Sequence, residues 1–263
     1  MTGAQLLHTL QLTDSLFPVG AFAYSDGLES AASSGHVHNA DSLARWLDHF
    51  LNDVFVPCEG LALLKCIRAA EKEEWATIRA IDEELTALKP AAETRNSSRS
   101  VGKRLLTTYA GIIQDGGFLS IAEALPQCNV PVAYAIVFSH RGLDAADALL
   151  AFGYLRLVGI VSAALRLIPM GQQQGQALLT SAIEQLPAAV ERIVQAGAEP
   201  LRLFNPLLDV QQMSHRYVYS RLFRSWLCEN RSRLAWVVPW VLARRPCWIV
   251  CARTCAANTI WQL

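Results

Sequence analysis

The sequence predicts an all-α protein, with a single helical-bundle domain built around a central buried helix and an atypical tail at the C-terminus. Three observations predict this fold class. Apolar residues recur with helical spacing along most of residues 1–225. Residues 143–168 are apolar on nearly every side, which is typical of a helix enclosed by others. The 263-residue chain is 52% hydrophobic and only 17% charged, so it can bury a sizeable core.

The clearest amphipathic helix is predicted over residues 41–56. Its apolar residues fall on one helical stripe: Leu43, Trp46, Leu47, Phe50, Leu51 and Val54. Asn39 or Asp41 can cap the N-terminus of this helix, because either side chain can accept a hydrogen bond from a free backbone N–H. Pro57 is then expected to end the helix or to open the next one.

The remaining elements follow from the same periodicity. Helices are predicted over residues 73–88, 91–114, 120–125, 143–168, 172–186 and 207–223. Ser120 and Glu123 have the spacing of a capping box at the start of one of them. Asp144 stands at the positive end of the central helix. Residues 132–138 are short, apolar and rich in β-branched side chains, so we predict a strand there, although no partner strand is apparent.

Residues 226–263 differ sharply in composition from the rest of the chain. They hold four of the seven cysteines and five of the seven tryptophans. Their five basic residues and one acidic residue give a formal charge of +4, whereas residues 1–225 hold 18 basic and 22 acidic residues, a charge of −4. No helical or strand period runs through them. We therefore predict a domain at 1–225 and a tail at 226–263 outside the fold, such as out-of-frame or read-through sequence. A membrane or partner anchor is the alternative.

Several classes of function are excluded or disfavoured by composition. Zero net charge argues against a dedicated nucleic-acid binder. No Lys- or Arg-led apolar segment follows Met1, so there is no sign of a signal peptide and a cytoplasmic location is expected. Asp147, Arg156 and Arg166 interrupt the longest apolar run, and charges near a bilayer centre cost roughly 2.5–3.5 kcal/mol each. No membrane span is predicted.

The common catalytic and metal-binding motifs are missing. Gly102 and Lys103 are followed by Arg104, which does not match a phosphate-binding loop. No GxSxG, HExxH or GxGxxG pattern occurs. His36 and His38 form an H-x-H pair, a weak metal signal without further ligands. The thiols of Cys247, Cys251 and Cys255 would share a helical face, but their spacing fits no common site. We predict no catalytic residue, no metal site and no cofactor.

Two segments are dense in special residues. Residues 17–29 combine two glycines and a proline with aromatic side chains, and Ser25 or Asp26 could cap a helix that carries Leu28 and Glu29. Residues 206–225 combine tyrosines with arginines, which are typical of binding hot spots. Either segment could instead be ordinary structure, since a turn packs its aromatic residues into the core and arginines in a last helical turn suit the helix dipole.

These segments carry a resemblance to a known family. The opening LQLTDSLFPVGAFAYSDGLES, the WLDHFL helix and the closing NPLLD, MSH and YSRLFRS resemble urease accessory protein F, over about residues 6–225. Members usually end near a motif like RLFRS. The resemblance implies an all-helical, non-catalytic factor that matures the nickel enzyme urease. It implies a homodimer that binds the accessory D (or H) protein, recruits the accessory GTPase and acts on apo-urease, where nickel enters in a GTP-dependent step.

The motif positions suggest which residues meet those partners. In the first segment they are Pro18, Gly20, Tyr24, Ser25, Gly27 and Glu29, and in the second they are His215, Tyr219, Arg221 and Arg224. Direct nickel carriage by His36, His38 and His215 is an alternative within this reading, although passive scaffolding is favoured because no strong ligand cluster exists. Two alternatives from other classes remain: a helical enzyme whose site is assembled from distant residues, and a membrane-associated protein anchored by its tail.

Overall fold

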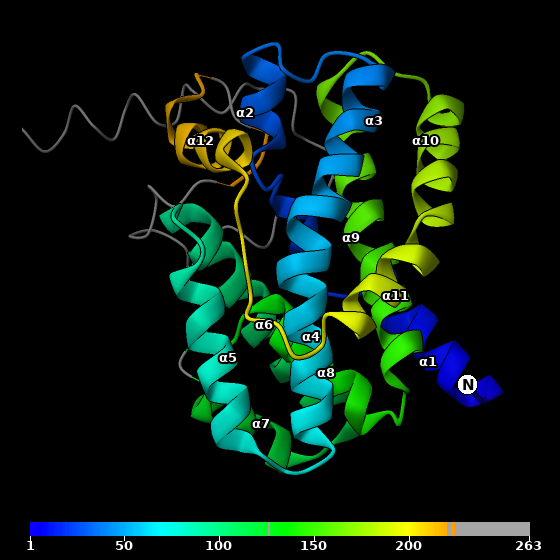
Figure 1. The fold of residues 1–263 in the computed structure, drawn as a ribbon, viewed down its shortest axis with the longest axis vertical. Coiled ribbons are helices and arrows are strands. Elements are labelled where there is room, and N and C mark those ends of the chain that lie inside the picture. The colour runs from blue at the N-terminus through cyan, green and yellow to red at the C-terminus, as the bar shows by residue number, and fades with distance from the viewer. Residues whose placement is uncertain (126, 220–221, 225–263) are drawn as a thin grey trace, which may run out of the picture. The chain divides into compact units, whose positions relative to one another are not determined.

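The computed structural model describes residues 1–125, 127–219 and 222–224, and every regular element within them is a helix (Figure 1). The predicted all-α class is therefore confirmed. The predicted tail at 226–263 lies outside the described residues, and the domain boundary near residue 225 stays a prediction.

The helices follow one another with short connections. The α-helices are α1 (Gly3–Thr13), α2 (Leu28–Ser33), α3 (Ala40–His49), α4 (Leu61–Ala70), α5 (Trp75–Ala87), α6 (Ala92–Ile113), α7 (Gly116–Ala124), α8 (Val130–His140), α9 (Ala145–Leu167), α10 (Gln172–Glu184), α11 (Leu186–Gln195) and α12 (Pro206–Ser214). A π-helix, η2 (Phe50–Gly60), and two 3-10 turns, η1 (Ala21–Ala23) and η3 (His215–Tyr217), complete the domain.

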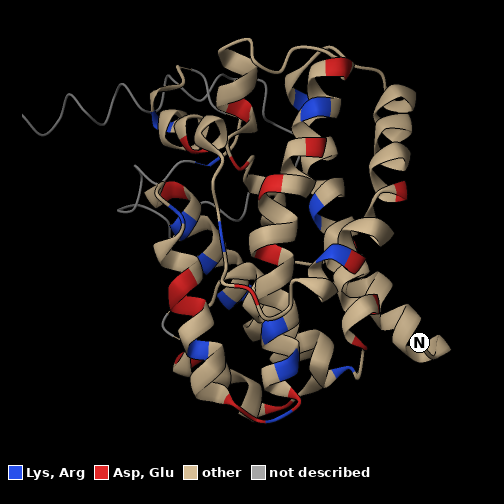
Figure 2. Cartoon of the chain, in the orientation of Figure 1, with Lys and Arg blue, Asp and Glu red and all other residues tan. Residues whose placement is uncertain are grey.

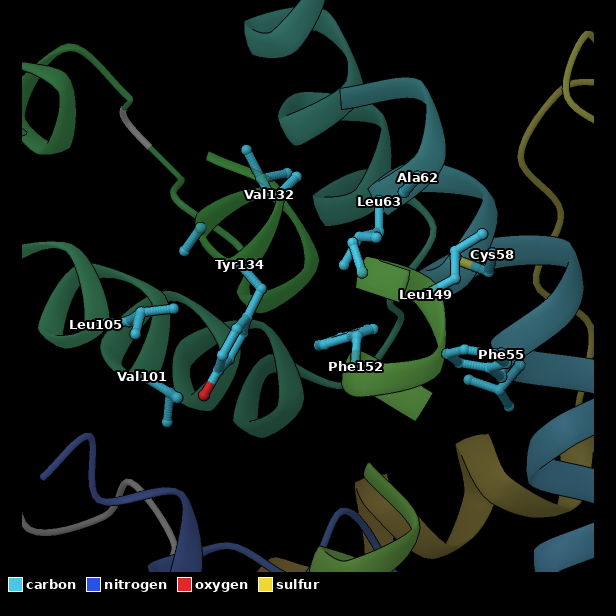
Figure 3. Close-up of a cluster of buried hydrophobic side chains, with 14 of the residues drawn as sticks. Phe55, Cys58, Ala62, Leu63, Val101, Leu105, Val132, Tyr134, Leu149 and Phe152 are labelled. Atoms are coloured by element: carbon cyan, nitrogen blue, oxygen red, sulfur yellow. The ribbon is translucent and has the colours of Figure 1, made fainter. Parts of the chain in front are cut away.

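The centre of the domain is formed where α4, α8 and α9 meet η2. Figure 3 shows side chains from these elements converging on one cluster, with Tyr134 of α8 beside Phe152 of α9. The ring centroids of Tyr134 and Phe152 lie 5.6 Å apart, and those of Phe152 and Phe55 lie 6.2 Å apart. Gly153 permits this approach, because a Cβ there would stand 3.0 Å from Phe55 and 2.6 Å from Leu186. The predicted buried centre is thus built from aromatic packing.

The prediction of a strand over residues 132–138 is wrong, because these residues form the middle of α8. Every residue from Pro131 to Phe138 is buried. A helix enclosed on all sides shows no polar face, so its sequence lacks the 3.6-residue period that identifies an amphipathic helix. Pro131 in the first turn needs no N–H partner and favours the helix start.

Three predicted helix boundaries are also corrected. The helix that begins at α3 is not broken at Pro57 but continues through η2 into α4, and the wider turns of the π-helix accommodate the missing N–H. α7 begins at Gly116, because the Asp115 side chain accepts a hydrogen bond from the Gly117 N–H at 2.8 Å, so the Ser120–Glu123 capping box does not form its start.

The third correction concerns the C-terminal helix, which was predicted to reach Phe223 but ends as α12 at Ser214 and is followed by the turn η3. Besides α8, two α-helices were not predicted from the sequence. These are α1, before the first special segment, and α11, which carries Pro187 in its first turn.

α9 is the described helix that is long and apolar enough to cross a membrane. Half of its most apolar 18-residue window is buried within the domain. Arg156, near the middle of α9, forms ion pairs with Asp26 and Glu59. Figure 2 shows charged residues of both signs interspersed along α3 and α5. We interpret α9 as the core helix of a globular domain, in which buried charges are paired.

Candidate partner-binding surface

The two special segments lie against each other in the folded chain. α12 packs beside α2, which ends the first segment (Figure 1). The Ser30 hydroxyl of α2 donates a hydrogen bond to Gln211 Oε1 of α12 at 2.8 Å. Both groups are buried. Segments about 180 residues apart in sequence are therefore joined by direct contacts.

The Glu29 side chain makes several of the contacts that join the two segments. Its carboxylate is buried, with Oε2 lying 2.6 Å from His215 Nε2. Oε1 accepts a hydrogen bond from the Leu222 N–H at 2.5 Å, and Oε2 also accepts one from the Phe223 N–H at 3.4 Å. A buried carboxylate needs such partners to offset its desolvation. One side chain thus holds both η3 and the segment that follows it.

A glycine makes the close packing of α12 on α2 possible. Gly27 has a φ of +92°, in the left-handed region that favours glycine. A Cβ at this position would stand 3.0 Å from Gln212 Cγ and 3.2 Å from the Gln212 backbone nitrogen. Gly20 has a φ of +73°, and a Cβ there would stand 3.2 Å from Arg104 Nη1 of α6. The glycines of the SDGLE and FPVG motifs are therefore explained by their left-handed backbone conformation and by close packing.

The last described residues are anchored to the first segment by further contacts. The Arg224 N–H donates a hydrogen bond to the Ala23 carbonyl at 2.8 Å. Arg166, at the end of α9, donates to the Phe22 carbonyl at 3.3 Å, and its guanidinium lies 4.3 Å from the ring centroid of Phe223. Such stacking joins a cation to an aromatic face. These contacts complete one continuous unit from two distant segments.

The exposed part of this unit is called the composite surface here. Its members are Pro18, Phe22, Tyr217, Tyr219, Leu222 and Arg224. Tyr219 is fully exposed, and Phe22, Tyr217 and Leu222 are more than 60% exposed. Exposed aromatic and aliphatic side chains that lie together mark a protein interaction site in many proteins.

Residues of the first segment form part of the lining of a cavity of about 500 Å³. Tyr24, Phe50, Tyr134 and Arg156 are among the residues that line it. Arg156 Nη2 lies 2.9 Å from Asp26 Oδ2, and its Nε lies 2.9 Å from Glu59 Oε2. Burial by itself would lower the pKa of Arg156, but the two carboxylates outweigh it and raise this pKa. These two ion pairs connect the first segment, through Asp26, to Arg156 of α9 and Glu59 of η2.

The structure brings most of the sequence-predicted site residues together, but at different depths. Pro18, Tyr219 and Arg224 are exposed, Gly20 and Tyr24 are half-buried, and Ser25, Gly27, Glu29 and His215 are buried. Arg221 lies outside the described residues. Their role in partner binding stays a prediction. The buried members have an internal role in the fold, because they hold the exposed members in place.

Sequence reasoning missed several residues that build this unit. The two segments are joined by contacts of Arg166, Gln211 and Gln212. The first segment is also joined to α9 by the ion pair between Asp26 and Arg156. Glutamines and arginines are common on helix surfaces, so no local signal distinguished these from solvated residues. Only the long-range contacts give them their role.

The histidine pair does not form a metal centre in the described part of the chain. No group of three or more His, Cys, Asp and Glu side chains able to hold a metal ion occurs there. His36 Nδ1 lies 2.8 Å from the Ser34 hydroxyl, and His38 Nδ1 lies 3.0 Å from the Gly35 carbonyl. His215 is engaged with Glu29. Contacts within the protein, local for His36 and His38 and long-range for His215, therefore occupy one ring nitrogen of each of these histidines.

Buried thiols offer no reactive nucleophile among the described residues. Cys58, Cys66 and Cys128 are free and buried. Burial, with smaller contributions from nearby carboxylates, raises the pKa of Cys58 and of Cys128 to about 12. It raises the pKa of Cys66 as well. Since the thiolate is the reactive form, these cysteines are inert near neutral pH.

Comparison with known proteins identifies the family. The UreF family model matches residues 37–183. The urease accessory protein UreF of Trichormus variabilis is 32% identical over 226 residues, which cover 86% of this chain and 98% of the relative. That of Methylobacillus flagellatus is 32% identical over 223 residues, 84% of this chain and 97% of the relative. That of Microcystis aeruginosa is 33% identical over 222 residues, 84% and 98%. The chain therefore belongs to the UreF family of urease accessory proteins.

Proposed function

We propose that this protein is a non-catalytic urease maturation factor of the cytoplasm. It scaffolds the accessory D (or H) protein and the accessory GTPase for GTP-dependent nickel insertion into apo-urease. Family membership supports a role in urease maturation. The observation that carries the scaffold role is the composite surface, where exposed aromatic side chains lie in segments that the buried carboxylate of Glu29 joins.

The anchoring of this surface to the fold by hydrogen bonds supports a docking role. Binding orders side chains and loops, and a surface that is already fixed avoids part of that cost. Here the Phe223 ring is buried and stacked by Arg166, while Tyr217 and Leu222 of the same segment remain exposed. Aromatic anchors on a fixed frame are typical of interface hot spots.

α1 supports the proposal that the protein is a homodimer. This helix carries no Asp, Glu, Lys or Arg. Leu6, Leu7 and Leu10 are each more than 40% exposed on it, although Leu12 on the same helix is buried. An apolar helix face without charge suits association with an identical face around a two-fold axis. Leu10→Asp should shift the protein to monomer in sedimentation, whereas Leu119→Asp on α7, with similar exposure, should not.

The proposal is tested by capture of the partners. Full-length protein should retain the purified accessory D protein, and the two together should retain the accessory GTPase. Neither the protein alone nor any subcomplex without the GTPase should hydrolyse GTP. A folded, helical protein that captures neither partner would remove the scaffold role.

A further inference from the structure

The composite surface is framed by arginines from three different parts of the chain. Arg104 Nη1 of α6 would lie 3.2 Å from a Cβ placed on Gly20. Arg166 of α9 contacts Phe22 and Phe223, and Arg216 of η3 follows His215, which is bonded to Glu29. All three are exposed. The fold therefore gathers positive charge around the two special segments, although residues 1–225 as a whole carry a formal charge of −4.

These three guanidinium groups form no ion pair within the described residues. The acidic side chains of the two segments are largely occupied elsewhere. Glu29 is buried against His215, and Asp26 is paired with Arg156. Asp14 is exposed near the first segment, and Asp209 is half-buried on α12. The nearby charge of Glu29 favours the cationic form of Arg166, whereas Arg104 and Arg216 have no ion-pair partner among the described residues. The frame thus carries positive charge that only Glu29 offsets in part.

The arginines differ in how free they are. The Arg166 guanidinium is committed to the Phe22 carbonyl and the Phe223 ring, while Arg216 lies 4.8 Å from the ring centroid of its neighbour Tyr217. Stacked guanidinium groups keep their outer N–H donors for a second partner. Arginine pairs with carboxylates through two parallel hydrogen bonds, so it favours acidic protein surfaces over neutral ones.

We propose that the composite surface recognises an acidic patch on its protein partner, with Arg104, Arg166 and Arg216 framing the exposed aromatic anchors. This inference rests on the proposed scaffold function and specifies the chemistry of the partner. Complementary charge at the rim of an interface steers encounter and raises the association rate, while the apolar centre holds the complex. The partner face that docks here carries carboxylates around an apolar centre.

The test compares two charge-reversed full-length proteins. One is Arg104→Glu with Arg216→Glu, which leaves the structural Arg166 intact. The matched control is Lys72→Glu with Arg79→Glu at α5 and the turn before it, where both residues are also exposed. Both variants change the net charge by the same amount. Circular dichroism confirms that each is folded, and association with the immobilised accessory D protein or GTPase is followed at several salt concentrations.

Wild-type association should slow as salt rises, because screening shortens the reach of charge. The framing variant should associate about tenfold more slowly at low salt and lose most of this salt dependence, while the control should match wild type. Capture of neither accessory protein by wild type would overturn the proposed function and this inference with it. Capture that responds to neither salt nor the framing reversals would overturn the inference alone. Binding of wild type to anionic vesicles in place of either protein would also overturn it.

Discussion

Glu29 Oε2 lies 2.6 Å from His215 Nε2, across 186 positions of sequence, and both side chains are buried. The same carboxylate receives the backbone N–H groups of Leu222 and Phe223. This contact places the C-terminal segment beside the first special segment. The hydrogen bonds of this carboxylate hold the chain at His215 and again at Leu222, before and after the exposed tyrosines Tyr217 and Tyr219.

Loss of this carboxylate should destabilise the domain. Glu29→Ala leaves His215 and two backbone N–H groups without their acceptor, and breaking a buried pair in this way costs roughly 3–5 kcal/mol. Urea denaturation should report the loss in the free energy of unfolding. Glu83→Ala, at an exposed site on α5, should change it by less than about 0.5 kcal/mol. Equal stabilities for the two variants would show that Glu29 does not hold the junction.

Gly27 and Gly35 form a matched pair for testing the packing of α12 on α2. Both have positive φ, but a Cβ at Gly35 meets nothing within 4 Å. Gly35→Ala should therefore cost about 1–2 kcal/mol, from backbone strain alone. Gly27→Ala adds a clash with Gln212 and should cost roughly 1–3 kcal/mol more. A thermal or urea melt that ranks them equally would mean that α12 moves away without cost.

Much of the fold was predictable, and the failures have physical reasons. The apolar stripe from Leu43 to Val54 identified its helix because the opposite face of that helix is polar and faces solvent. α8 was mistaken for a strand because burial on every side removes the period on which the prediction relies. Pro57 was expected to end the helix, but it lies inside the π-helix η2, whose wider turns accommodate a residue without an N–H.

The candidate site was only half predictable. Motifs marked Gly27, Glu29 and His215 as special, but no local pattern tells that a histidine near the C-terminus meets a glutamate near the N-terminus. The arginine frame was not foreseen for the same reason. Arg104, Arg166 and Arg216 lie far apart in sequence and share a surface only after folding.

The buried thiols should respond to folding and to pH. At pH 8 a thiol reagent should leave Cys58, Cys66 and Cys128 unmodified in the native protein and label them in denaturant, as peptide mass mapping would show. For Cys58 and Cys128 the folded pKa of about 12 exceeds the ordinary value of 9.0. The stability that these two thiols contribute is therefore complete below pH 9 and is lost as pH rises from 9 towards 12. Native labelling at pH 8 would contradict their burial.

Removal of residues 226–263 should leave partner capture intact. The described contacts that hold the composite surface, those of Glu29 with Leu222 and Phe223 and of Ala23 with Arg224, lie within residues 1–225, so a chain that stops at Ser225 keeps them. Full-length and shortened proteins should be compared for capture of the accessory D protein and for sedimentation with liposomes. Liposome binding that disappears with the tail would instead support a membrane anchor.

The most direct test of the account is the affinity of Tyr219→Ala for the accessory proteins. Tyr219 is fully exposed on the composite surface, and its removal should leave the free energy of unfolding unchanged. Trp75→Ala on α5 is the control, because Trp75 is also an exposed aromatic residue but is not part of the composite surface. We predict that Tyr219→Ala weakens capture of an accessory protein by at least about tenfold, as expected for a hot spot, while Trp75→Ala does not. Wild-type affinity in both variants would contradict it.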